Sequence, residues 1–110
     1  MDKTSLTELA EKSLAEARDT NSGRSAHTVH GGHASTLRQT VVALVGGRRL
    51  DEHESPGEAT LYVLAGRVRL TSGEDGQEAG AGDLVVIPDA RHALEALEDS
   101  VVLLTVAKLA

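Results

Sequence analysis

The sequence from residue 50 to residue 66 reads LDEHESPGEATLYVLAG, and RVRL follows immediately. Pro56-Gly57 is a dipeptide typical of a tight turn, and the run of β-formers at 59–64 predicts a strand. Gly66 then offers a position at which the chain can reverse into the next strand. This stretch therefore predicts a β-hairpin that carries one histidine, His53, beside its turn.

Short runs of Val, Leu, Ile and Thr fill the chain from residue 26 onward, divided by Gly, Pro and Asp turns. These runs predict nine strands, near Ala26–His30, Thr36–Val45, Arg49–His53, Ala59–Leu64, Arg67–Ser72, Gln77–Ala79, Leu84–Ile87, Ala93–Leu97 and Val101–Ala107. Nine short strands at close spacing predict an all-β fold, an antiparallel sandwich or barrel.

The N-terminal segment differs in character, because residues 4–18 show a helical period with a narrow apolar stripe. Ser5 and Glu8 fit a capping box, in which each side chain binds a backbone donor at the start of a helix. A helix of about four turns with so little apolar surface is marginal alone, so it must dock on its own barrel or on a partner subunit. We expect two parts, a helix with its linker at 1–25 and a barrel at 26–110.

The amino-acid composition limits the kinds of ligand and chemistry that the protein can support. The 110 residues suffice for one domain, and they include no Phe, no Trp and one tyrosine, so any pocket is aliphatic and polar. A formal charge of −6 disfavours nucleic acid, and the absence of cysteine excludes disulfides and thiol catalysis. No apolar signal core or membrane-spanning stretch appears, so we expect a cytoplasmic protein with no nucleic-acid or membrane partner.

Two parts of the sequence carry a resemblance to a known family. In the first, Gly47 opens the run, His53 follows, Pro56 lies in the turn and Gly66 closes it. In this order the residues resemble the first motif of the cupin superfamily, which runs glycine, five residues, His-x-His, three or four residues, glutamate, six residues, glycine.

The second cupin motif runs glycine, five residues, proline, x, glycine, two residues, histidine. Here Gly82 is followed by five residues and Pro88, Ala90 takes the glycine position, and His92 comes one residue early. The resemblance covers about residues 38–108. It implies a cupin-type β-barrel, also called a double-stranded β-helix or jelly roll, which is often dimeric.

The resemblance also implies a metal site. In metal-binding cupins two histidines and a glutamate of the first motif and one histidine of the second hold a divalent ion. Here Ser55 and Ala59 stand at the second histidine and glutamate positions, and Glu58, one residue off, faces the opposite side of a strand. His53 and His92 remain as the candidate metal ligands, and two imidazoles alone make a weak site.

A further histidine could complete that site. The tract at 27–33 contains His27, His30 and His33, and the glycines before His33 could form a turn that brings it near the barrel mouth. His27 and His30 cannot both point inward from one strand, because a spacing of three alternates faces. The simpler interpretation is that these are exposed loop histidines.

Arginines offer a second kind of site: Arg38, Arg67, Arg69 and Arg91 would form an anion clamp if several faced the lumen. The simpler interpretation is a solvated face paired with acids such as Glu58, Glu78 and Asp89.

If Ala59 keeps the inward aim that the resemblance implies for the family's glutamate, Tyr62, which alternates with Leu61 and Val63, points out of the lumen. Together with the stripe on the helix, the apolar residues Tyr62, Leu64 and Val102 or Leu104, taken as outward-facing, predict a homodimer formed by sheet contact.

Two functions of different class remain open. The loss of the ligand positions at Ser55 and Ala59 favours a cupin that binds a small molecule in its barrel without robust catalysis and requires no cofactor. The alternative is a metal-dependent cupin oxygenase or isomerase that uses His53 and His92 with a further ligand and a divalent ion. A proton-transfer enzyme using His92 without metal is a third, weaker interpretation.

Overall fold

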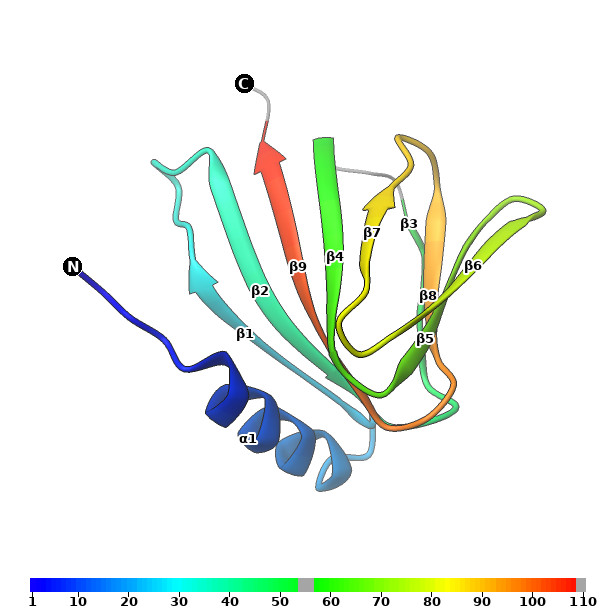
Figure 1. The fold of residues 1–110 in the computed structure, drawn as a ribbon, viewed down its shortest axis with the longest axis horizontal. Coiled ribbons are helices and arrows are strands. Elements are labelled where there is room, and N and C mark those ends of the chain that lie inside the picture. Colours follow the sequence, from blue (N-terminus) through cyan, green and yellow to red (C-terminus); the bar gives the residue numbers. More distant parts are fainter. Residues whose placement is uncertain (54–56, 109–110) are drawn as a thin grey trace.

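The structure is a computed structural model and describes residues 1–53 and 57–108. One helix precedes nine strands (Figure 1). Their bounds are α1 (Leu6–Arg18), β1 (Arg24–His30), β2 (Leu37–Leu44), β3 (Arg49–His53), β4 (Gly57–Ala65), β5 (Arg67–Ser72), β6 (Asp75–Gly80), β7 (Leu84–Ile87), β8 (His92–Ala96) and β9 (Ser100–Lys108). The prediction of an all-β fold with a short N-terminal helix is confirmed.

The strands form two antiparallel sheets that face each other. The larger sheet has the order β1-β2-β9-β4-β7 and the smaller has the order β3-β8-β5-β6. Figure 1 shows them as the two walls of a sandwich, with β6 and β7 diverging from their shared connection. The arrangement is therefore a jelly-roll sandwich whose two sheets are not closed into one continuous barrel.

The predicted strands match the observed ones closely, and the largest differences lie in β4 and β6. The chain was expected to turn over residues 73–76, but Ser72 pairs with Asp75 and the ladder continues to the end of the hairpin. Only Gly73 and Glu74 lie between the paired positions, and Gly73 adopts a φ of +59° that suits such a two-residue turn. Strand β6 therefore begins at Asp75 rather than at the predicted Gln77.

The predicted hairpin of residues 50–66 is wrong. Strand β4 belongs to the larger sheet, whereas β3 and β5 belong to the smaller one, so consecutive strands alternate between sheets. Gly66 alone connects β4 to β5, and one residue does not make the two-residue loop of a tight hairpin. The predicted turn at Pro56-Gly57 lies partly outside the described residues.

Gly66 turns the chain from one sheet to the other under tight constraints. Its φ is +83°, and a Cβ at this position would clash with Asp99 O and Ser100 Oγ. The buried Ser100 hydroxyl accepts a hydrogen bond from Arg67 N at 3.0 Å, immediately after the glycine. Glycine is required here because other residues rarely adopt this conformation and none would fit.

The core lies between the sheets and consists of aliphatic side chains: Val42, Leu44, Ala59, Leu61, Val63, Val68, Leu70, Ala79, Ile87, Leu94, Ala96, Val102 and Val106. Leu104 packs against it. The expectation that Val102 or Leu104 faces outward is therefore wrong. Val102 pairs with Val63 and Leu104 with Leu61, so both lie on the inner face of β9.

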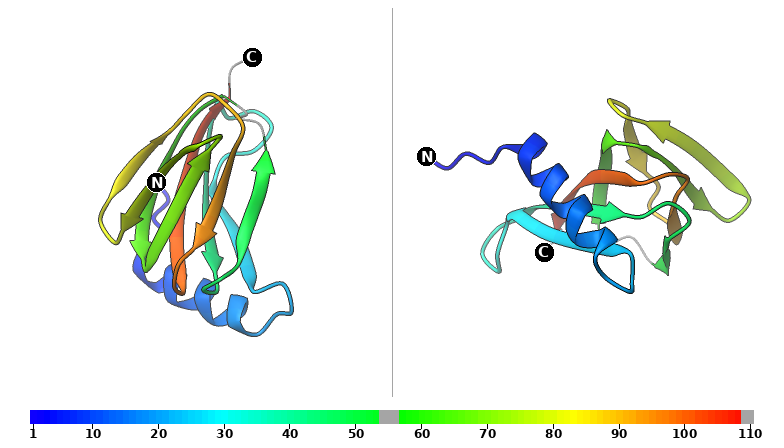
Figure 2. Two further views of the ribbon diagram at one scale, coloured as in Figure 1. Left: turned by 90° about the vertical axis from the view of Figure 1, so that its right-hand side faces the viewer. Right: turned by 90° about the horizontal axis from the view of Figure 1, so that it is seen from below.

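Helix α1 covers part of the outer face of the larger sheet (Figure 2), packing against β1 and β2. A second apolar cluster forms there from Ala10, Ala17, Val41, Ala43 and Val101. At its start, Ser5 Oγ accepts a hydrogen bond from Glu8 N at 3.3 Å, as the capping box predicts. The helix therefore docks on its own sheet. It is the only helix in the described part of the chain, and it is not long and apolar enough to cross a membrane.

Asp99 ties the end of the helix to the turns at one end of the sandwich. Its Oδ2 accepts a hydrogen bond from Arg18 Nε at 2.9 Å, and its Oδ1 accepts one from Gly46 N at 2.9 Å. The Gly46 N–H, followed by the Arg18 guanidinium, lowers the pKa of Asp99 below its ordinary value. The ionised carboxylate thus links α1 to the turn that follows β2.

Candidate functional site

The two histidines predicted as metal ligands occupy paired positions on neighbouring strands. Strands β3 and β8 are antiparallel, and His53 lies opposite His92 after a register shift that follows Leu50. Directly opposed Cα atoms in such a ladder are generally about 4.5–5.5 Å apart. The fold therefore brings these two backbone positions together, although they are 39 residues apart in sequence.

The His92 side chain is buried, with 4% of its surface exposed. Its Nδ1 lies 2.9 Å from Ala90 O, and since a carbonyl only accepts hydrogen bonds, Nδ1 must carry the proton. In the neutral ring Nε2 then holds the lone pair that could bind a proton or a metal. The turn that places this carbonyl is short, because Ala90 N donates to Pro88 O at 2.8 Å.

The remaining ligand positions of the motif supply no donor in the described residues. Ala59 is buried in the core between its cross-strand neighbours Ile87 and Val106. Glu58 is exposed on the opposite face of β4, as the strand alternation predicts. Ser55 lies outside the described residues.

The histidine tract does not complete the set. His27 pairs with Val41 on the outer face of the larger sheet, where its Nε2 lies 3.0 Å from Glu16 Oε2 of the helix. His30 and His33 are exposed. Among the side chains that the structure describes, which do not include those of residues 52–56, no group of three or more His, Asp or Glu could hold a metal ion.

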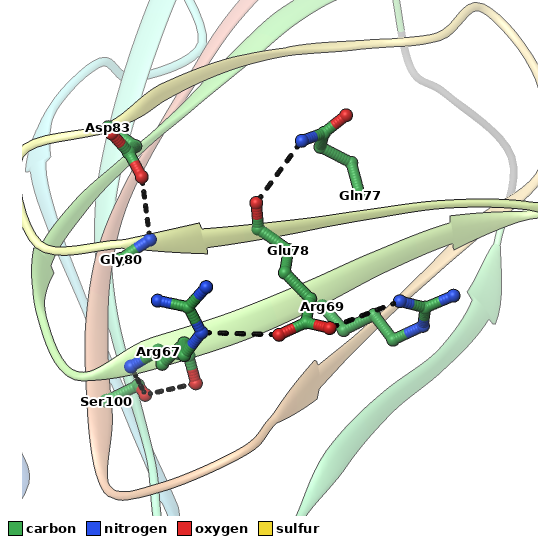
Figure 3. A network of polar contacts seen from close by, with 7 residues as sticks. All are labelled: Arg67, Arg69, Gln77, Glu78, Gly80, Asp83 and Ser100. Carbon is green, nitrogen blue, oxygen red and sulfur yellow. Dashed lines mark hydrogen bonds and ion pairs between the residues drawn. The ribbon is translucent and has the colours of Figure 1, made fainter.

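Two of the four arginines form an ion-pair network on the outer face of the smaller sheet (Figure 3). Arg67 Nε lies 3.2 Å from Glu78 Oε1, and Arg69 Nη1 lies 3.6 Å from Glu78 Oε2. Their neighbours Val68 and Leu70 are buried, so the two arginines point away from the core. The interpretation as a solvated face paired with acids is confirmed for this pair, and Arg38 and Arg91 are exposed.

A large cleft opens between the edge strands β6 and β7. It has a volume of about 970 Å³. The described residues that line it come from the β5–β6 hairpin and from β7 with its flanking turns: Leu70, Ser72, Asp75, Gly76, Gln77, Glu78, Ala79, Asp83, Leu84, Val85, Val86, Pro88 and Ala90. Leu70, Ala79 and Val85 belong to its apolar wall. His92 is not among its lining residues, so the cleft and the paired histidines are separate features of the sandwich.

Polar groups of the cleft come from Ser72, Asp75, Gln77 and Asp83. Asp83 Oδ2 accepts a hydrogen bond from Gly80 N at 2.8 Å, and Gln77 Nε2 donates to Glu78 O at 3.3 Å (Figure 3). Ser72 Oγ donates to Arg91 O at 2.8 Å. These groups can bind a polar ligand through hydrogen bonds, but they include no nucleophile paired with a base.

Sequence reasoning did not single out Asp75, Gln77 or Asp83. Each is an ordinary turn or surface residue in its local context. They line one cleft only because β6 and β7 diverge, and no local sequence pattern shows that two edge strands diverge. The short β7, bounded by Gly82-Asp83 and Pro88, was the one signal of a weakly covered edge.

Comparison with known proteins shows the family to which the chain belongs. A family model described as "Cupin domain" matches residues 40–107. No curated protein sequence matches the chain. A conserved protein of unknown function from Streptococcus pyogenes is 28% identical with a TM-score of 0.73, over 83% of this chain and 79% of that one.

Two further structures share the fold at lower identity. A cupin superfamily protein from Desulfitobacterium hafniense is 14% identical with a TM-score of 0.71, over 78% of each chain. A single-residue mutant of the salicylate 1,2-dioxygenase from Pseudoaminobacter salicylatoxidans is 19% identical with a TM-score of 0.77, over 91% of this chain and 34% of that one. At these identities the likeness is one of fold alone.

Proposed function

Because the chain belongs to the cupin domain family, we propose that it binds a small molecule in the cleft between β6 and β7 and has no robust catalytic activity. The cleft itself is the observation that carries this proposal. Its volume of about 970 Å³ is within the range of small-molecule sites, about 300–1,000 Å³. An aliphatic wall with a few convergent polar groups is the usual composition of such sites.

The donor set argues against the metal chemistry of the family. A tight divalent site usually needs three or four protein ligands, and the family's glutamate position holds the buried Ala59. An alanine donates nothing, and the exposed Glu58 lies on the other face of the strand. The residues present therefore do not fit a complete cupin metal site.

A ligand screen tests the proposal directly. We expect fragments with an aliphatic body to raise the melting temperature and to shift the backbone amide resonances of residues 70–79 and 83–90. Gln77→Trp should fill the cleft and abolish these effects. Glu74→Trp, in the turn of the same hairpin but outside the lining, should leave them intact. Purified protein that turned over a substrate while no ligand stabilised it would overturn the proposal.

A second candidate is a metal-dependent oxygenase or isomerase that uses His53 and His92 with a further ligand. The paired register of the two positions and the burial of His92 favour it. It predicts stoichiometric zinc, iron, manganese or nickel in protein purified without a His-tag. His53→Ala should abolish both metal content and activity, whereas the exposed His33→Ala should change neither. Metal content that His53→Ala leaves unchanged would eliminate this candidate.

A further inference from the structure

We infer that the cleft between β6 and β7 selects cationic ligands with an aliphatic body over anionic ligands of the same shape. The inference rests on the proposed function, because it names the class of small molecule that this cleft would bind. It depends on three properties of the described lining: which charges it contains, where the nearest arginines lie, and what the apolar wall can contact.

The charged side chains that line the cleft are all acidic. They are Asp75, Glu78 and Asp83, and no lysine, arginine or histidine is among the described lining residues. Glu78 is paired with Arg67 and Arg69, and these three side chains together carry a net charge of +1. Asp75 and Asp83 therefore set the sign of the electrostatic potential in the cleft.

The arginines nearest the cleft lie on the far side of the hairpin. In β6, Ala79 is buried in the core, so alternation places Asp75 and Gln77 on the same inner face. Glu78 lies on the outer face, where Figure 3 shows both guanidinium groups gathered around its carboxylate. The two guanidinium groups thus lie on the outer face of the hairpin, where Arg69 borders Gly76 of the cleft lining, whereas Asp75 and Gln77 lie on the inner face.

Asp83 holds its place through the turn that joins β6 to β7. Its Oδ2 accepts a hydrogen bond from Gly80 N at 2.8 Å, and its backbone N donates to Gly80 O at 2.9 Å. Gly82 has a φ of +92°, which suits the third position of such a turn. The carboxylate is therefore fixed at the vertex from which the two strands diverge, and one of its oxygens is engaged in the turn.

The apolar wall selects for the body of the ligand. Its apolar residues are Leu70, Ala79, Leu84, Val85, Val86, Pro88 and Ala90. None carries an aromatic ring, so a ligand gains contact area rather than stacking energy. Gln77 adds an amide that can donate and accept hydrogen bonds. Asp75 and Asp83 lie at opposite ends of β6, so an aliphatic amine would place its carbon body on this wall and its ammonium group near one of the two carboxylates.

Electrostatics then decides between ligands of equal shape. An ammonium group partly removed from water is stabilised by nearby carboxylates, whereas a carboxylate is repelled by them and loses its hydration. The overall charge of −6 acts in the same direction at longer range. We expect a preference of at least about tenfold at low ionic strength.

Three probes with one carbon skeleton test the selectivity: cyclohexylmethylamine, cyclohexylmethanol and cyclohexanecarboxylate. Each is titrated into the intact protein at pH 7 while amide resonances are recorded. The amine should bind tightest, shift the resonances of the cleft residues, and exceed the carboxylate in affinity by about tenfold. The preference should shrink in 0.5 M NaCl, because salt screens partly exposed charges.

The double variant Asp75→Asn, Asp83→Asn should equalise the amine and the carboxylate. Asparagine can still accept the hydrogen bond from Gly80 N, so the turn is kept. Glu74→Gln removes a carboxylate from the same hairpin outside the lining and should leave the preference unchanged.

Each contrary result is informative. Equal binding of all three probes in the cleft would overturn the selectivity while the proposed binding function stands. Binding of none, when other fragments shift the same resonances, would also overturn the selectivity alone. A preference that survives in the double variant would show that the two aspartates do not cause it. If no fragment binds the cleft at all, the proposed function fails as well.

Discussion

Glu16 of α1 and His27 of β1 face each other, with 3.0 Å between the carboxylate Oε2 and the imidazole Nε2. Ser25 Oγ donates to the same Oε2 at 3.2 Å. The contact attaches the helix to the edge of the larger sheet and holds His27 on the outer face. A residue that sequence alone left open as a metal ligand is therefore part of the helix docking site.

This contact makes helix docking depend on pH. The hydrogen bond from His27 is the main cause that lowers the pKa of Glu16 below its ordinary 4.5. Because the folded-state pKa is the lower one, the stabilisation is fully present above about pH 4.5 and is lost as the pH falls through the folded value. We expect Glu16→Gln to lower the melting temperature at pH 6, with a difference from wild type that shrinks toward pH 3.

Glu11→Gln is the matched control for that experiment, since it removes an exposed carboxylate from the same helix. Thermal unfolding followed by circular dichroism from pH 6 to pH 3 compares the two variants. A difference between wild type and Glu16→Gln that stays constant over this range would contradict the electrostatic origin.

The strands could be predicted because explicit turn residues divide them. Leu84–Ile87, for example, lies between Gly82-Asp83 and Pro88, and the structure places β7 at those bounds. The sheet to which a strand belongs could not be predicted from such signals. Gly66 marks a reversal in either case, and only the close approach of Ser100 shows that it joins two sheets rather than closing a hairpin.

The sequence could not predict which residues of β9 face the core either. Residues 101–104 are all aliphatic, because one face of the strand meets the core and the other meets the apolar cluster beneath the helix. A strand covered on both faces shows no alternation, so nothing in its sequence separates Val102 from Val101. The motif spacing did single out His53 and His92, whose backbone positions are paired. The cleft could not be predicted, because it depends on how far two edge strands diverge.

Ser13 gives a prediction about stability. Its side chain is fully buried beneath the helix, and Ser13 Oγ has no hydrogen-bond partner among the described residues. A buried hydroxyl without a partner costs about 1–3 kcal/mol, and alanine is also the better helix former. Ser13→Ala should therefore stabilise the protein by about 1 kcal/mol in urea unfolding.

The exposed Ala15 of the same helix offers the reverse comparison. Ala15→Ser introduces a hydroxyl that water can solvate, so it should cost only the difference in helix propensity, about 0.5 kcal/mol. Destabilisation by Ser13→Ala would mean that the hydroxyl is bound by a partner such as a buried water molecule.

Ala59→Glu tests whether the inner face retains the geometry of a metal site. A carboxylate placed at this buried position should cost about 3 kcal/mol without metal, because the core around it is aliphatic. If His53 and His92 lie close enough to share an ion with it, Zn²⁺ should restore much of that loss, by about 2.7 kcal/mol at a hundredfold excess over Kd.

Ala96→Glu is the control, since Ala96 is equally buried in the same core but holds no ligand position of the motif. Melting temperatures with and without Zn²⁺ compare the two variants. If Zn²⁺ rescues both variants, or neither, Ala59 does not lie within reach of an ion shared with His53 and His92.

Helix α1 packs mainly against β1 and β2 and leaves the outer face of the larger sheet uncovered around β4 and β7. Tyr62 and Leu84 are cross-strand partners there, and Val86 pairs with Thr60 beside them. Tyr62 is 36% exposed, Leu84 63% and Val86 72%, and residues 60–64 of β4 and 84–87 of β7 carry no formal charge. Two copies of a chain with charge −6 can approach each other most easily on such a face, so we expect a homodimer formed through it.

Tyr62→Asp should dissociate that dimer, because a two-fold contact brings the two new carboxylates close together. Leu84 and Val86 also line the cleft but Tyr62 does not, so ligand binding should persist in the Tyr62→Asp monomer. Leu97→Asp changes an equally exposed apolar residue away from this face and should leave the dimer intact. Light scattering after size-exclusion chromatography should give about twice the 11.5 kDa chain mass for wild type. A wild-type monomer at 100 µM, or a dimer that survives Tyr62→Asp, would place any contact between copies elsewhere on the molecule.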